Sequence, residues 1–338
     1  RMGPQRIKNK IGLIYVLLLI PSFIALEDFI RQDISHAIAG PLCLGFGLLL
    51  FQNQTIIKQN IINYLVALLL PIISLISILI LSTLQFGQID FYASYIYEYT
   101  TAGIGPNQAS NILGLGILIS FLLFILDNKS RFIYLVLLFI LIFQTIITYS
   151  RGGFWNAIIS VGIAALFSLI SKNDIRKFVI TFSLISSIFY FLLLPIIDDL
   201  SQQSITTRYG DTEFDRRGSI IESEIHAFRH NKFFGIGPGE SRKYRIKYFN
   251  SPKHTHTEYS RLLAEHGIFG IVLIFLLISL LIKAFKNKTG ISRSISLSLA
   301  TWSLLFMFHS ATRLVAPSMI FSFAMANIYI KEKDSSKD

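Results

Sequence analysis

Arg151 is the centre of the first cluster of residues that could do chemistry, residues 148–153 (Thr-Tyr-Ser-Arg-Gly-Gly). These residues fall between two long apolar runs and predict a turn of about four residues. Glycines let the backbone turn tightly, and an arginine fixed beside them can hold a phosphate through two parallel hydrogen bonds. The cluster therefore predicts a phosphate contact at a membrane surface. The alternative is an arginine that reaches from the end of a span to the lipid surface.

Four arginines form the second cluster, on a segment whose apolar residues are spaced as in a helix. The arginines are Arg208, Arg216, Arg217 and Arg229, and the apolar positions are Ile220, Ile221, Ile225 and Phe228. Such a helix would pack its apolar stripe downward and offer arginines at its start to an anionic substrate. The alternative is an amphipathic helix at the membrane surface, whose arginines contact lipid headgroups.

The third cluster combines a glycine-rich stretch, a basic run and two histidines. It comprises residues 233–240 (Phe-Phe-Gly-Ile-Gly-Pro-Gly-Glu), a run that includes Arg242, and the pair His254 and His256. A histidine near the bilayer surface and close to arginines is suited to act as a general base, because its pKa lies near physiological pH. No cysteine or set of carboxylates accompanies the histidines, so we predict no metal site.

The basic run and the glycines indicate which ligands the third cluster could take. Between Arg229 and Lys253 there are seven basic residues against one acid, an excess that favours an anionic partner. The glycines match neither a dinucleotide nor a phosphate-loop fingerprint, because no strand precedes them and the lysine and hydroxyl spacing is missing. We therefore expect no nucleotide chemistry and no cofactor.

Long apolar runs make up the elements that must position these clusters. The 338 residues are 52% apolar and only 15% charged, which excludes a soluble globular protein and indicates a membrane protein. Ten runs predict spans, at about 11–26, 34–51, 61–84, 108–126, 132–149, 154–170, 178–197, 267–283, 295–311 and 314–330. Because the bilayer core offers no hydrogen bonds to the backbone, runs of this length are helices. The sequence thus predicts an all-α polytopic membrane protein with about ten transmembrane helices in a single domain, residues 1–338.

Basic residues set the expected orientation, because lysine and arginine are retained on the cytoplasmic side. With the N-terminus inside, the inner connections hold most basic residues, and the short outer turns hold only Arg31, Arg151 and Arg313. This pattern predicts two cytoplasmic termini and one large outer loop, residues 198–266. It also accounts for most of the net charge of +11, so no nucleic acid is expected as a partner.

The order and spacing of these motifs resemble those of the bacterial O-antigen ligases. Their relatives, the O-antigen and exopolysaccharide polymerases and the protein O-oligosaccharyltransferases, share the pattern. The resemblance covers about residues 100–275. It is carried by Gly105-Pro106-Asn107, by Ser150-Arg151-Gly152-Gly153, by Arg217 followed eighteen residues later by Gly235-Ile236-Gly237-Pro238-Gly239, and by residues 256–268 (His-Thr-Glu-Tyr-Ser-Arg-Leu-Leu-Ala-Glu-His-Gly-Ile).

The resemblance implies a GT-C-like glycosyltransferase of the bacterial inner membrane, with a periplasmic active site in part on residues 198–266. It would move glycan from an undecaprenyl-diphosphate carrier to lipid A-core, with inversion and without a metal. Arg151 and Arg217 would bind the diphosphate, and His256 would activate the acceptor hydroxyl. Further substrate contacts are expected from Asn107, Arg208, Arg216, Arg242 and His254.

Other functions stay open at this point. A polymerase would use a second lipid-linked glycan as the acceptor, and a protein oligosaccharyltransferase would use a protein. From different classes, the chain could be a lipid-glycan transporter or a catalytically silent scaffold. The scarcity of charged residues within the spans and the gathering of candidate residues on one face argue against a transporter.

Overall fold

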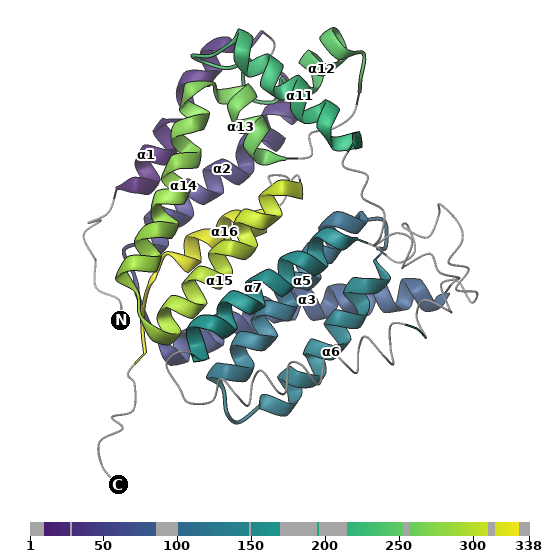
Figure 1. The fold of residues 1–338 in the computed structure, drawn as a ribbon, viewed down its shortest axis with the longest axis vertical. Helices are drawn as coiled ribbons and strands as arrows, with labels where there is room; N and C mark the ends of the chain where they lie inside the picture. Colours follow the sequence, from purple (N-terminus) through teal and green to yellow (C-terminus); the bar gives the residue numbers. More distant parts are fainter. Residues whose placement is uncertain are drawn as a thin grey trace. The chain divides into compact units, whose positions relative to one another are not determined.

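The chain forms two compact units in a computed structural model, residues 1–58 with 214–338 (unit 1) and residues 59–213 (unit 2). The structure describes residues 10–27, 29–85, 101–148, 150–169, 195, 215–252, 257–309 and 315–330. Both units are predominantly helical (Figure 1). This confirms the prediction of a helical membrane protein.

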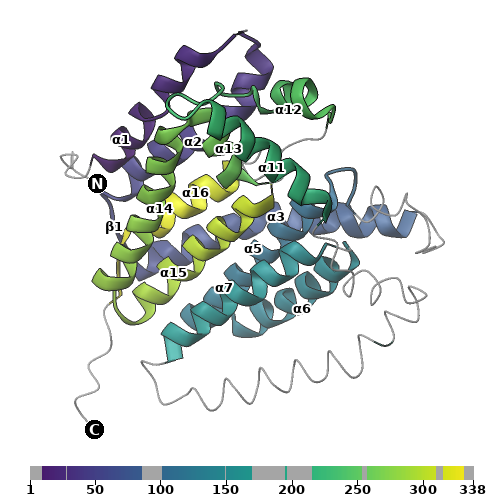
Figure 2. The same cartoon turned by 45° about the horizontal axis from the view of Figure 1, so that its top comes forward.

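Unit 2 contains four described helices. They are α3 (Lys58–Gln85, in this unit from residue 59), α5 (Pro106–Leu126), α6 (Arg131–Ile147) and α7 (Arg151–Leu169). Helix α5 packs against both α6 and α7 and is mostly buried (Figure 2). Small residues permit this close packing: a Cβ atom on Gly114 would lie 2.8 Å from the carbonyl oxygen of Gly153 in α7. Unit 2 is thus built around α5.

The apolar helices of unit 1 come from both ends of the chain. They are α1 (Ile11–Leu17), the 3-10 helix η1 (Ile20–Ala25), α2 (Arg31–Phe51), α14 (Ile268–Asn287), α15 (Gly290–Phe306), the 3-10 helix η3 (Met307–His309) and α16 (Val315–Ala324). Helix α2 packs against α1 and α16. Gly47 leaves room for Ser322, whose hydroxyl donates to the carbonyl of Leu44 at 3.0 Å. The N-terminal and C-terminal helices therefore form one body.

Three polar helices of unit 1 lie within the segment predicted as a large loop. They are α11 (Asp215–His230), α12 (Ser241–Phe249) and α13 (Glu258–His266). Helix α13 packs against α11, α12 and α14, and the three polar helices gather at one end of unit 1 (Figures 1 and 2). This part of the segment is a helical layer, and it carries the predicted site residues from Arg216 to Arg242.

A two-stranded parallel sheet departs from the all-helical prediction. Strand β1 (Thr55–Ile57) pairs with β2 (Asn327–Tyr329), with Ile56 opposite Ile328. The predicted span 314–330 is therefore wrong in its length, because the helix ends at Ala324. Lys288 holds the end of α16 in place, because its ammonium donates to the carbonyls of Ala324 and Ala326 at 2.9 and 2.5 Å. Burial lowers the pKa of Lys288 to about 8.

The described helices occupy every predicted span range except 178–197, of which only Pro195 lies within the described residues. Five are long and apolar enough to cross a membrane, at Arg31–Phe51, Lys58–Ser82, Pro106–Leu126, Ile268–Asn287 and Gly290–His309. Three further apolar helices are shorter, at Ile11–Ala25, Arg131–Ile147 and Val315–Ala324. The lengths of the five long helices suit a bilayer.

Candidate functional site

Arg151 is the first residue of α7 in unit 2 and is half-buried. Helix α6 ends at Ile147, so the connection is one residue shorter than the predicted turn and the glycines lie inside the helix. The N-terminus of a helix carries unpaired N–H groups and a partial positive charge, which favour an anion. The structure therefore places the guanidinium of Arg151 beside a second source of positive potential.

Asn107 is tied to the residue that precedes Arg151. Its side-chain oxygen accepts a hydrogen bond from the hydroxyl of Ser150 at 3.0 Å. Its carbonyl accepts from the amide of Asn111 at 2.8 Å, and Asn111 in turn accepts from Asn156 of α7 at 2.9 Å. This chain of hydrogen bonds joins the first turns of α5 and α7. Asn107 thus fixes the backbone next to Arg151, whereas the sequence predicted it as a substrate contact.

Gly153 sets how closely α5 and α7 approach. A Cβ atom there would lie 2.2 Å from the carbonyl carbon of Ser110, whereas one on Gly162 of the same helix would meet nothing within 4 Å. We expect Gly153→Ala to destabilise the protein by about 1–3 kcal/mol through overpacking. Gly162→Ala should stabilise it by about 0.5–1 kcal/mol, because alanine is the better helix former. Thermal unfolding in detergent measures both; equal effects would contradict the close packing.

Arg217 lies on α11, and His256 comes shortly before α13 in the sequence. Arg217 lies in the first turn of α11, and His256 precedes Thr257, the N-cap of α13, whose hydroxyl accepts from the N–H of Ser260 at 3.4 Å. Helices α11 and α13 are in contact. The side chains of Arg216 and Arg217, and all of Arg208, His254 and His256, lie outside the described residues.

A buried ion pair joins the three polar helices. Glu224 of α11 accepts hydrogen bonds from Arg245 of α12 at 2.7 Å and from the hydroxyl of Ser260 of α13 at 2.5 Å. Arg245 also donates to Ser223 at 3.0 Å, and both charged side chains are only 1–2% exposed. We call Glu224, Arg245 and Ser260 the clamp. It holds α11, which carries Arg217, against α12 and α13.

The clamp accounts for part of the positive charge of the basic run. Arg245 is neutralised by Glu224 inside the protein, and Lys243 pairs with Glu240 at 2.8 Å. Arg242 remains exposed, with its Nε donating to the carbonyl of Pro252 at 3.3 Å. Two basic residues of this run, Lys243 and Arg245, are therefore paired with carboxylates of the protein itself.

A second buried pair holds α13 against α2. The guanidinium of Arg261 lies 2.8 Å from the carboxylate of Glu258 and donates to the carbonyl of Ala37 at 3.1 Å. This arginine is 8% exposed, and removing either partner would leave a charge in the interior. The helix that follows His256 is thus anchored on both sides.

The glycine-rich stretch packs against the end of α13. The N–H groups of Ile236 and Gly237 donate to the carbonyls of Ala264 and Glu265 at 2.9 and 3.2 Å. Gly235, Gly237 and Gly239 all have positive φ angles, a backbone region that disfavours other residues. This contact between the glycine-rich stretch and the end of α13, which we call the seam, sets the position of α13.

Gly235 and Gly103 allow crowding to be separated from backbone strain, since both have φ of +73°. A Cβ on Gly235 would lie 2.4 Å from the backbone of Glu265, whereas one on Gly103 would meet nothing within 4 Å. We expect Gly103→Ala to cost about 1–2 kcal/mol and Gly235→Ala about 3 kcal/mol. Denaturant unfolding measures both, and equal costs would show that the seam tolerates a side chain.

His266, at the end of α13, is buried and neutral. The hydroxyl of Ser22 donates to the carbonyl of Leu19 at 2.7 Å, so it must accept from Nδ1 of His266, which lies 2.7 Å away. Burial, together with the nearby charge of Arg261, lowers the pKa of His266 to about 3. This histidine therefore carries its proton on Nδ1 and does not titrate near neutral pH.

The low pKa of His266 predicts that stability falls in mild acid. Below the ordinary pKa of 6.5 the unfolded chain takes up a proton that the folded chain excludes, so folding weakens as pH falls. The expected loss is about 1.4 kcal/mol per pH unit below that pKa. Unfolding of wild type and His266→Asn between pH 7.5 and pH 5 measures it. An identical slope in the two proteins would contradict the assignment.

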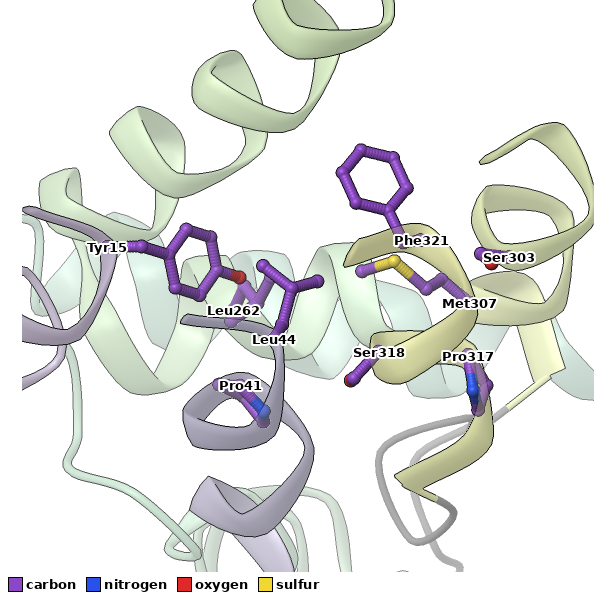
Figure 3. Close-up of a pocket in the computed structure, with 9 residues that line it drawn as sticks. All are labelled: Tyr15, Pro41, Leu44, Leu262, Ser303, Met307, Pro317, Ser318 and Phe321. Atoms are coloured by element: carbon purple, nitrogen blue, oxygen red, sulfur yellow. The ribbon is translucent and has the colours of Figure 1, made fainter. Parts of the chain in front are cut away.

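A small cavity in unit 1 is lined by Tyr15, Leu44, Leu262 and Phe321 (Figure 3). Its volume of about 20 Å³ is enough for about one water molecule. Its lining is mainly apolar, and a sugar ring does not fit. The residues that the structure describes contain no group of three or more histidine, cysteine, aspartate or glutamate side chains that could hold a metal ion.

The long apolar helices define a helical integral membrane protein. Residues 115–275 match the family model described as O-antigen ligase. This match confirms the resemblance to the O-antigen ligase family that the motifs predicted. It includes Arg151, Arg217 and His256.

A curated relative supports the same family. The chain is 25% identical over 310 residues to the ComP-specific O-oligosaccharyltransferase of Acinetobacter baylyi. The similarity covers 84% of this chain and 55% of the relative. The chain therefore spans about half the length of that protein.

Proposed function

We propose that the protein is a membrane glycosyltransferase that moves a glycan from undecaprenyl diphosphate to lipid A-core at the periplasmic face of the inner membrane. The observation that carries the proposal is the O-antigen ligase match, because it spans Arg151, Arg217 and His256 in one segment. The position of Arg151 at the start of α7 supports an anionic donor.

The proposed reaction is a single displacement at the anomeric carbon. The acceptor oxygen forms a bond to this carbon while the bond to the diphosphate oxygen breaks, and the acceptor proton passes to His256. Arg151 and Arg217 stabilise the negative charge that grows on the leaving diphosphate. Attack from the opposite side inverts the anomeric configuration. Arginines can supply here the charge that a metal ion supplies elsewhere, so the proposal needs no metal.

A protein acceptor is the second candidate. The Acinetobacter baylyi relative is named as an O-oligosaccharyltransferase specific for ComP. The donor chemistry would be the same, and a serine or threonine hydroxyl would replace the hydroxyl of lipid A-core. A polymerase would instead extend a second lipid-linked glycan.

Transfer by the purified chain tests the proposal. The protein in detergent is given an undecaprenyl-diphosphate-linked glycan and EDTA, with lipid A-core, a second lipid-linked glycan or the protein ComP in separate reactions. Modified lipid A-core would support a metal-independent ligase. A lengthened lipid-linked chain would indicate a polymerase, and a glycosylated protein would indicate the second candidate. No transfer in any reaction would contradict the proposal.

A further inference from the structure

Four rings on α11 and α12 form an aromatic platform: the exposed His230 and Tyr248 and the half-buried His226 and Tyr244. On each helix the two rings are four residues apart and therefore lie on successive turns of one face. The centroids of Tyr244 and Tyr248 are 4.5 Å apart, and those of His226 and His230 are 4.2 Å apart. The two helices are in contact (Figure 1). The ring centroid of His226 lies 6.0 Å from that of Tyr244 and 6.4 Å from that of Tyr248, so the two pairs form one surface.

Hydrogen bonds fix the rings of the platform. His226 and the hydroxyl of Tyr244 are joined across the two helices at 2.8 Å. His230 donates from Nδ1 to the carbonyl of His226 at 2.9 Å, which leaves its Nε2 as an acceptor when the ring is neutral. Tyr248 is 55% exposed. The platform is therefore preorganised, and its outer rings reach solvent.

The exposed charges near the platform are two basic residues and one acid. Lys247 lies 5.3 Å from the centroid of the Tyr248 ring, and on α11 the exposed Glu222 and Arg229 are four residues before and three residues after His226. Helix α12 contains four basic residues among nine, which is too polar for the hydrocarbon core of a membrane. An aromatic surface with this charge favours a ligand that is itself both flat and anionic.

We propose that this platform binds an anionic glycan through its sugar rings. A pyranose presents a face of C–H groups and an edge of hydroxyls, which match the apolar face and polar edge of tyrosine and histidine. Lys247, beside the Tyr248 ring, would pair with a carboxylate or phosphate on the glycan. The choice of ligand rests on the proposed function. The platform would hold sugar units away from the bond that reacts.

Direct binding to the full chain in detergent tests the platform. The probe is a short oligosaccharide that alternates uronic acid and N-acetylhexosamine, with the dissociation constant measured by calorimetry. We expect Tyr248→Ala to weaken binding about fivefold to tenfold. The matched control is Tyr329→Ala on β2, because Tyr329 is 59% exposed and lies outside the platform; it should bind as the wild type does.

Two outcomes would overturn the inference. One is equal binding by Tyr248→Ala and the wild type. The other is binding of soluble short-chain phosphatidylglycerol, but not of the oligosaccharide, in a way that depends on Tyr248, which would make the surface a lipid contact. Binding does not require transfer. An inactive protein that still binds the oligosaccharide through Tyr248 would therefore contradict the proposed function and leave the platform standing.

Discussion

Arg217→Ala and His256→Ala should each reduce glycan transfer to background while leaving the protein in the membrane at normal levels. In the proposed reaction Arg217 stabilises the charge on the leaving diphosphate, and loss of one such donor costs about 100-fold to 1000-fold in rate. In the same proposal His256 accepts the acceptor proton, and loss of such a base costs about 100-fold to 10,000-fold. Initial rates of transfer by the purified variants measure both effects.

Arg229→Ala is the matched control for Arg217→Ala. It removes an exposed arginine from the last turn of α11, at the opposite end of the same helix. The control lowers the net charge by the same amount, so a general electrostatic effect would appear in both variants. We expect near-normal transfer in the control. Full transfer by both Arg217→Ala and His256→Ala would sink the site assignment.

Glu224→Leu should destabilise the protein by about 3–5 kcal/mol, because it leaves the charge of Arg245 buried without its partner. The guanidinium is 1% exposed, and burial already lowers the pKa of Arg245 against the opposing effect of Glu224. We also expect slower transfer, since the clamp positions α11 and α13. Denaturant unfolding gives the first quantity, and transfer rates at saturating substrate give the second.

A double variant separates stability from positioning. Glu224→Leu combined with Arg245→Met replaces the ion pair by apolar side chains of similar volume, an exchange that is often neutral for stability. We expect the double variant to recover most of the lost stability while transfer remains slow, with an unchanged KM. Wild-type transfer by a stable double variant would show that the clamp does not position the site.

Apolar run length predicted the helices well, because a bilayer demands continuous helices of fixed length. The run 108–126 corresponds to α5, Pro106–Leu126. The run 314–330 was misjudged, since strand residues such as Ile328 and Tyr329 are as apolar as helical ones. Pairing with β1, far away in the sequence, decides their structure.

The clamp illustrates what the pattern could not predict. The sequence pointed to Ile221, Ile225 and Phe228 as parts of an apolar stripe, yet these are only half-buried. The buried face of α11 passes through Ile220 and Glu224, at the same helical spacing. A carboxylate is expected outside unless it is paired, and its partners here are 21 and 36 residues away along the chain. The one signal in the sequence was that Glu224 follows the apolar Ile220 by four residues, which places its carboxylate on the same helix face.

The pairing of β1 with β2 bears on the order in which the protein can be made. Residues 55–57 leave the ribosome long before residues 327–329. Strand β1 must therefore wait for β2, and the face of α2 that contacts α16 must wait for α16. Unit 2, residues 59–213, is continuous in sequence and can assemble during that interval. If synthesis stopped before β2, unit 2 could therefore be folded while unit 1 was still incomplete. Such a partly folded chain would be a target for membrane quality control.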